Sequence, residues 1–266
     1  VSESDPELAL VAFHSLFNMV GVIAVLPFTA RFAALIERLV PERGNPLTRR
    51  LDSSLVQAPD LAVPAVQATV CDLLGAIFGE LSTVLVDENS QQPYRADDIR
   101  DALSQTQQYM RQVFVAPDSS LYPRHAASIH ILDHLRRLFV RMSESERVSA
   151  VLKIDELTEM RKQLASTARQ VAGDPLAIDA KTCQRFRNDY HHLKSREKPF
   201  RRETVAQAAQ GKLAPDAVIE RPDAMRSLRR MAYHVWRIIR HLHIDYGDDS
   251  PSRSAAVARK STEGTA

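Results

Sequence analysis

The chain opens with one long uncharged stretch, Leu8 to Ala30, in which apolar residues are interrupted by a histidine, an asparagine, a glycine and a proline. A helix of this length is about 35 Å long, enough to cross a hydrocarbon layer of about 30 Å. Acidic residues precede the stretch, where a secretory signal would carry basic ones. We therefore predict a transmembrane helix, with a buried helix of a large soluble protein as the alternative.

The polar residues of this stretch are predicted to share one face. At 100° per residue, His14, Asn18 and Gly21 lie within about 60° of one another. Polar groups at membrane depth face protein or water, and glycine permits close helix packing. We expect this stripe to pack against other transmembrane helices or to line a pathway, and Pro27 to kink or end the helix.

No second stretch of this kind occurs, and the chain starts with valine, so we expect the other helices of a membrane domain to lie upstream. Basic residues, which favour the cytoplasmic side, follow the stretch within about twenty residues. They are Arg31, Arg38, Arg43, Arg49 and Arg50. Everything after about residue 40 is therefore predicted to be cytoplasmic, and a chain with only two cysteines, Cys71 and Cys183, is consistent with a reducing compartment.

The rest of the chain is predicted to be all-α, because its apolar residues recur at spacings of three and four and never alternate at period two. Ser143 with Glu146 forms a capping box, Gly173 with Pro175 ends a helix, and Pro222 with Asp223 starts one. The predicted helices span 61–88, 95–115, 121–142, 145–172, 179–212 and 222–246. The expected organisation is a last transmembrane helix in 1–40, a linker over 41–58, an antiparallel helical bundle over 59–246 and a disordered tail over 247–266.

The sequence contains no recognisable motif of a catalytic site. The sequence has no glycine-rich phosphate loop, no paired-cysteine motif and no local signature for a serine nucleophile, so we expect no enzymatic activity. His130 and His134 are spaced i, i+4 on one predicted helix, with Asp133 beside them. These three are weak candidates for metal ligands, and a partly buried histidine pair is the alternative.

Charge is distributed unevenly. Residues 60–120 hold nine acidic residues and three arginines, a net charge of about −6, whereas 181–243 hold fifteen basic and six acidic residues, a net of about +9. One interpretation is that the first and last bundle helices pair with each other. The other is contact with phosphate, a partner or membrane lipid through arginines, because guanidinium groups suit phosphate geometry. The candidates are Arg136, Arg137, Arg229 and Arg230. Few aromatic residues are available for base stacking, so we expect no nucleic-acid partner.

Several segments together resemble a known family. "AFHSLFNMVGVIAVLPF", then "LIERLVPE", then "RRLDSSLVQAPDLAVPAV", "IHILDHLRRL" and "AYHVWRIIRHL" occur in this order. They are similar to the C-terminal end of bacterial sodium/phosphate cotransporters, where the last membrane helix is joined to a cytoplasmic PhoU-like domain. The resemblance covers most of residues 8–245. One departure is that His130, Asp133, His134 and Arg137 replace an acidic motif that often binds metal clusters, with an Asp133–Arg137 ion pair as the simpler interpretation.

The resemblance implies that the intact protein moves phosphate with sodium through inverted repeats in the inner membrane, and that the bundle senses or regulates. The Gln-Ser-Ser substrate signatures of those repeats are absent from this chain, which places the principal phosphate and sodium ligands upstream. The implied partners are upstream transmembrane helices, sodium, phosphate and membrane lipids, with a second copy of the chain as a further candidate and no covalently bound cofactor. A soluble PhoU-like regulator and a helical metal-binding protein are the alternatives.

Overall fold

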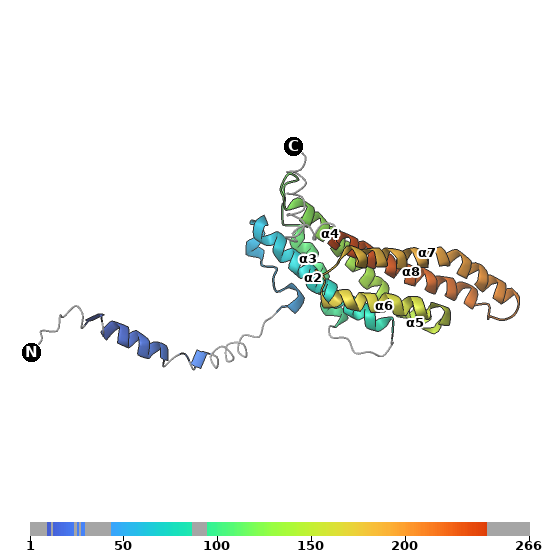
Figure 1. Cartoon of the computed structure of the whole chain (residues 1–266), viewed down its shortest axis with the longest axis horizontal. Helices are drawn as coiled ribbons and strands as arrows, with labels where there is room; N and C mark the ends of the chain where they lie inside the picture. Colours follow the sequence, from blue (N-terminus) through green and yellow to red (C-terminus); the bar gives the residue numbers. More distant parts are fainter. Residues whose placement is uncertain are drawn as a thin grey trace, which may run out of the picture. The chain divides into compact units, whose positions relative to one another are not determined.

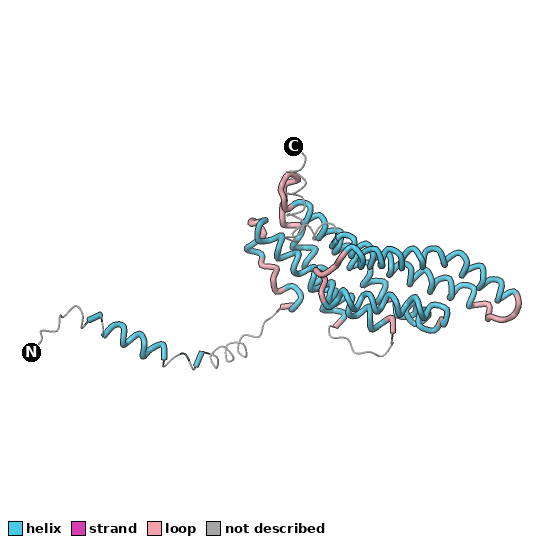
Figure 2. The backbone as a smooth tube through the Cα atoms, in the orientation of Figure 1, coloured by secondary structure: helices cyan, strands magenta, loops and turns pink. Residues whose placement is uncertain are grey.

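The computed structural model describes residues 10–11, 13–23, 26, 28–29, 44–86 and 95–243. The described residues form helices and turns without any strand, so the all-α prediction is confirmed (Figure 2). Two compact units divide the chain, Val1–Gly44 and Asn45–Ala266. The predicted tail, 247–266, lies outside the described residues, as do Pro27 and the first three arginines of the predicted cytoplasmic side.

The first unit contains the helix Phe13–Ile23, which covers only part of the predicted transmembrane stretch, because several positions between 8 and 30 are not described. Its apolar side chains are exposed, with Phe13 and Phe17 each 68% exposed. Asn18 Nδ2 lies 3.0 Å from His14 Nε2, within hydrogen-bonding distance, so these two polar side chains share one face as the sequence predicts. A Cβ atom added at Gly21 would have none of the surrounding heavy atoms within 4 Å.

The second unit is a helical bundle (Figure 1). Two short 3-10 helices, in the segment predicted as a linker, precede the long helices, and Leu47, in the first of them, is buried in the core of the bundle. The elements are η1 Pro46–Thr48, η2 Ser53–Leu55, α2 Pro59–Val84, α3 Ala96–Met110, α4 Tyr122–Met142, α5 Ser145–Lys153, η3 Asp155–Leu157, α6 Thr158–Gly173, α7 Ala180–Ala209 and α8 Ala217–His241.

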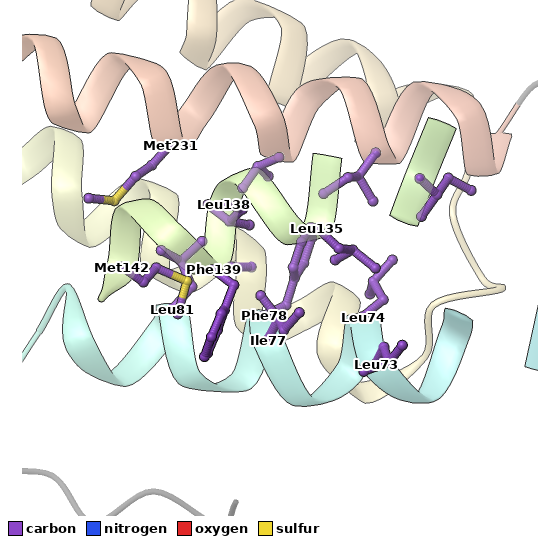
Figure 3. Packing of buried hydrophobic residues seen from close by; sticks show 14 of the residues in the cluster. Leu73, Leu74, Ile77, Phe78, Leu81, Leu135, Leu138, Phe139, Met142 and Met231 are labelled. Carbon is purple, nitrogen blue, oxygen red and sulfur yellow. The ribbon is translucent and has the colours of Figure 1, made fainter. Parts of the chain in front are cut away.

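Helix α4 holds the bundle together, because it packs against α2 and α8 (Figure 3). Helix α2 also contacts α3 and α6, and α8 also contacts α5 and α7. Fully buried side chains line these interfaces, including Phe78, Leu135 and Leu138. Burial of each such side chain stabilises the fold by roughly 1.5–3 kcal/mol.

Helices α7 and α8 form an antiparallel hairpin (Figure 1). Gly211, with φ +68°, ends α7 in the left-handed conformation. The Lys212 amide then donates to the Gln207 carbonyl at 2.9 Å and the Gly211 amide to Ala208 at 2.9 Å, the two hydrogen bonds of a Schellman motif. This turn reverses the chain and lays α8 along α7.

Helix α2 is, among the described residues, long and apolar enough to cross a membrane by length and composition. In its most apolar window, 56% is buried inside the bundle, as is expected of a core helix. Polar Glu80 on this helix is itself only 7% exposed. The sequence predicted a helix of the bundle in this segment and not a second membrane helix, and the packing of α2 agrees with that prediction.

Some predicted helix limits and one predicted cap are wrong. The helix predicted over 145–172 is broken at Ile154, whose φ of −97° and ψ of 107° are extended. Ser143 does not cap the following helix; its hydroxyl donates to the Phe139 carbonyl at 2.9 Å and so satisfies the end of α4. Pro222 does not start the last helix. The helix begins at Ala217 and contains Pro222 in its second turn, where a proline removes one backbone hydrogen bond. The predicted stop at Gly173 is confirmed.

Leu135→Ala tests the role of α4. Leu135 is fully buried, so its loss should leave a cavity and lower the free energy of unfolding by about 2–5 kcal/mol. Val140→Ala on the same helix is the control: Val140 is 53% exposed, and its change should stay within about 0.5 kcal/mol. Urea unfolding followed by circular dichroism measures both, and equal effects would contradict the central position of α4.

Candidate functional site

A band of polar side chains runs along the contact between α4 and α8. At 100° per residue, the members on each helix lie within about 100° of one another, so each set lies on one helical face. We call this band the polar seam; it consists of His130, Asp133, His134, Arg137 and Arg141 on α4 with Asp223, Arg226, Ser227, Arg230, His234 and His241 on α8. It divides into a histidine cluster and an arginine groove.

The histidine cluster is formed by His130, His134, His234 and His241. Nδ1 of His134 lies 3.1 Å from Nδ1 of His234, although the two residues are 100 positions apart in the chain. The rings of His130 and His241 stack with centroids 5.0 Å apart and an interplanar angle of 15°. Two helices therefore each contribute a pair of imidazoles to one contact.

Both central histidines are held neutral at pH 7. Burial is the largest cause that lowers the pKa of His134 to about 4, and the charges of His234 and Arg237 add to it. Burial also lowers the pKa of His234 to about 4, with Arg137 and Arg141 contributing next. Two neutral rings at 3.1 Å can share one hydrogen bond, in which one Nδ1 donates and the other accepts.

The predicted metal candidates are not brought together as a metal site. Arg137 Nε lies 2.9 Å from Asp133 Oδ2, so the simpler interpretation of this motif, an ion pair one turn apart, is confirmed. His134 faces His234 across the helix contact instead of combining with His130 and Asp133. Within 10–29 as far as described, 44–86 and 95–243, no group of three or more histidines, cysteines or acidic residues is arranged to hold a metal ion.

The arginine groove lies where α4, α5 and α8 meet. It has a volume of about 190 Å³. Its lining consists of Arg141, Glu144, Arg147, Asp223, Arg226, Ser227 and Arg230. Of these residues, only Arg230 is proposed from the sequence as an anion contact. The spacing of arginines along α8 could also have indicated Arg226, once the contact of α8 with α4 was known.

Two carboxylates in the groove are already paired. Glu144 accepts from Arg141 at 2.8 Å and from Arg147 at 2.5 Å. Asp223 accepts from Arg226. Arg230 is exposed and forms no ion pair with any residue that the structure describes. The groove thus carries four guanidinium groups and two carboxylates, a surplus of two positive charges.

The other arginines predicted as anion contacts lie elsewhere. Arg137 is paired with Asp133, and Arg229 Nε lies 2.7 Å from Glu197 Oε2 on α7. Arg136 is exposed on α4 beside a separate cavity that α3 and α4 line. The structure therefore places Arg230 in the groove and Arg137 in the adjoining seam, and it leaves Arg136 and Arg229 outside both.

The expected pairing of the acidic first helix with the basic last helix is wrong. Figure 3 shows α4 between α2 and α8. Arg229 and Arg221 of α8 instead pair with Glu197 and Glu156, while Asp72 of α2 pairs with Arg50. Net charge over a long segment does not identify neighbours, because an ion pair depends on which individual side chains lie close together in the folded chain.

Comparisons of the chain with protein-family models, with curated proteins and with solved structures find no match. The fold and the polar seam define an all-helical bundle with a neutral histidine contact and a basic groove.

Acidification should weaken the fold through the histidine pair. The pKa of each imidazole is about 4 in the folded chain and about 6.5 when unfolded, so the unfolded chain binds more protons between these values. Above about pH 6.5 both imidazoles are neutral in the folded and the unfolded chain, so the pair does not reduce the free energy of unfolding. The free energy of unfolding decreases as the pH falls from about 6.5 toward 4. The double variant His134→Gln/His234→Gln should flatten the fall in urea midpoint between about pH 6.5 and 5.

His192→Gln is the matched control, since His192 is exposed on α7 and should leave the pH dependence unchanged. Circular dichroism in urea at constant detergent concentration gives the midpoints. An unaltered pH profile in the double variant would contradict the assignment of this dependence to the histidine cluster.

Proposed function

We propose that this chain is the C-terminal portion of a sodium-dependent phosphate transporter of a bacterial inner membrane, whose bundle regulates the membrane domain. The observation that carries the proposal is the helix Phe13–Ile23, which exposes apolar side chains while a His14–Asn18 contact occupies one face. An exposed apolar helix needs lipid or further helices around it. The family resemblance supplies the transported ions, sodium and phosphate.

Regulation is favoured over catalysis by the chemistry of the described side chains. His134 and His234 are within hydrogen-bonding distance of each other. The groove carboxylates, Glu144 and Asp223, form ion pairs with arginines. Burial raises the pKa of the Cys71 thiol to about 11, so the reactive thiolate is scarce at neutral pH. The described residues therefore offer no activated nucleophile with a base beside it.

In this proposal the polypeptide after about residue 40 is cytoplasmic. The arginines that follow the apolar stretch favour that orientation, and the bundle folds against its own core from Asn45 onward. The partners of the first unit are upstream transmembrane helices and lipid. His14, Asn18 and Gly21 would contact those helices without being the principal phosphate ligands.

A second candidate is a soluble PhoU-like regulator. It is favoured by one observation, that the helix with enough length and apolarity to cross a membrane, α2, is largely buried in the bundle. Fractionation of cells that make the full-length protein separates the two: the transporter proposal requires the protein in the membrane fraction until detergent is added.

Deleting residues 59–266 from the intact transporter tests the regulatory role. We expect the shortened protein to retain sodium-dependent phosphate uptake and to lose the change in uptake that follows phosphate starvation. Radioactive phosphate uptake in cells grown with high or low phosphate measures this, with immunoblotting of membranes as the control for insertion. A response equal to that of the intact protein would reject the regulatory role, and complete loss of uptake would indicate a structural one.

The double variant His14→Leu/Asn18→Leu tests the polar face of the apolar helix. Loss of both polar groups from a helix–helix contact should reduce uptake or the yield of folded transporter. Met19→Leu, on the same helix and away from the His14–Asn18 face, should leave both unchanged. If the double variant matches Met19→Leu in uptake and in folded yield, the polar face has no role in the membrane domain.

A further inference from the structure

We infer that the arginine groove is a binding site for a phosphate group, held by Arg230, Arg226 and the hydroxyl of Ser227. The site would give the bundle a ligand to respond to. Its regulatory meaning rests on the proposed function, whereas binding can be measured separately.

Ser227 provides the first argument. Its side chain is only 4% exposed, yet Oγ has no hydrogen-bond partner among the described residues. Leaving a buried hydroxyl unsatisfied costs about 1–3 kcal/mol. Ser227 lines the groove, so an oxygen of a bound anion could accept a hydrogen bond from this hydroxyl.

Charge provides the second argument. The groove has two more guanidinium groups than carboxylates, and Arg230 forms no ion pair with the described residues. Planar guanidinium groups bind phosphate through two parallel hydrogen bonds. Burial is the largest cause of the lowered pKa of His234, one turn beyond Arg230, and the positive charges of Arg137, Arg141 and Arg230 lower it further. An anion in the groove would offset this surplus.

The size of the groove fits a small ligand. The groove volume of about 190 Å³ is below the roughly 300–1,000 Å³ of pockets that enclose larger organic ligands. It corresponds to about six water molecules at roughly 30 Å³ each. This space suits one hydrated tetrahedral oxyanion, either free phosphate or the phosphate of a lipid headgroup.

The direct test is calorimetric titration of inorganic phosphate into the full 266-residue chain, held in phosphatidylcholine nanodiscs at low ionic strength. Arg230→Gln should raise the dissociation constant about tenfold, because it removes a charge-assisted contact. Ser227→Ala should raise it by a smaller factor, with the helical circular dichroism unchanged. Arg240→Gln is the matched control, since Arg240 is an exposed arginine of the same helix that does not line the groove.

A second set of nanodiscs, containing phosphatidylglycerol, identifies the source of the phosphate group. If the natural ligand is a lipid headgroup, phosphatidylglycerol should compete and weaken phosphate binding in the wild-type chain and in Arg240→Gln. If it is free phosphate, lipid composition should have no effect. Either result, with loss in Arg230→Gln, supports the site.

Two results would overturn the inference: no phosphate binding up to about 10 mM, or equal weakening by Arg230→Gln and Arg240→Gln, which would indicate non-specific attraction to a basic helix. These results are distinct from failure of the transport proposal. Phosphate binding that needs Arg230, in a transporter whose uptake response survives deletion of the bundle, would reject the regulatory function and keep the site.

Discussion

The packing of α4 against both α2 and α8 is the interaction on which the rest of the bundle depends. Leu135 and Leu138 are fully buried, while Asp133, His134 and Arg137 lie along the edge of the same helix. The apolar face fixes α4 in the core, and the polar edge is thereby placed beside α8. The seam is thus a consequence of core packing, because ion pairs at a partly hydrated edge contribute only about 0–1 kcal/mol each.

The two halves of the seam respond to this position in different ways. At the histidine cluster, burial lowers the pKa of His134 and His234 and keeps both rings neutral, so they can hydrogen-bond without a counter-ion. At the arginine groove, the guanidinium groups cannot become neutral, and their charge is met by carboxylates, by water or by a bound anion. Glu144 and Asp223 meet only half of it. The surplus positive charge therefore lies at the arginine groove, where Arg230 is exposed.

The sequence predicted the helices well where a local signal defined them. Apolar periodicity located α2, α3, α4, α7 and α8, whereas α5 and α6 were predicted as one helix, which ends at Gly173 as expected. It failed where one residue had two possible uses: Ser143 hydrogen-bonds backward to Phe139 instead of capping the next helix, and Pro222 lies inside α8. These choices depend on which neighbours pack nearby, and periodicity does not contain that information.

The site was less predictable than the fold. The i, i+4 spacing of His130 and His134 drew attention to α4, but their relation to His234 and His241 depends on a contact between residues about 100 positions apart. Arg230 was recognised by type, whereas Ser227 carried no signal until its burial and its missing partner were visible. A site made by two distant helices is specified by tertiary packing, and only its individual residue types are present in the local sequence.

Two apolar helices in this chain show why composition alone does not assign a membrane segment. Helix α2 has the length and hydropathy to span a bilayer, yet α3, α4 and α6 cover it. The described part of the first helix, Phe13–Ile23, is shorter, yet its phenylalanines are about two-thirds exposed, 68% each. A buried helix has its apolar surface satisfied by protein, whereas an exposed one needs another apolar environment. What surrounds each helix, more than how apolar it is, therefore decides whether its apolar surface is covered within the described part of the chain.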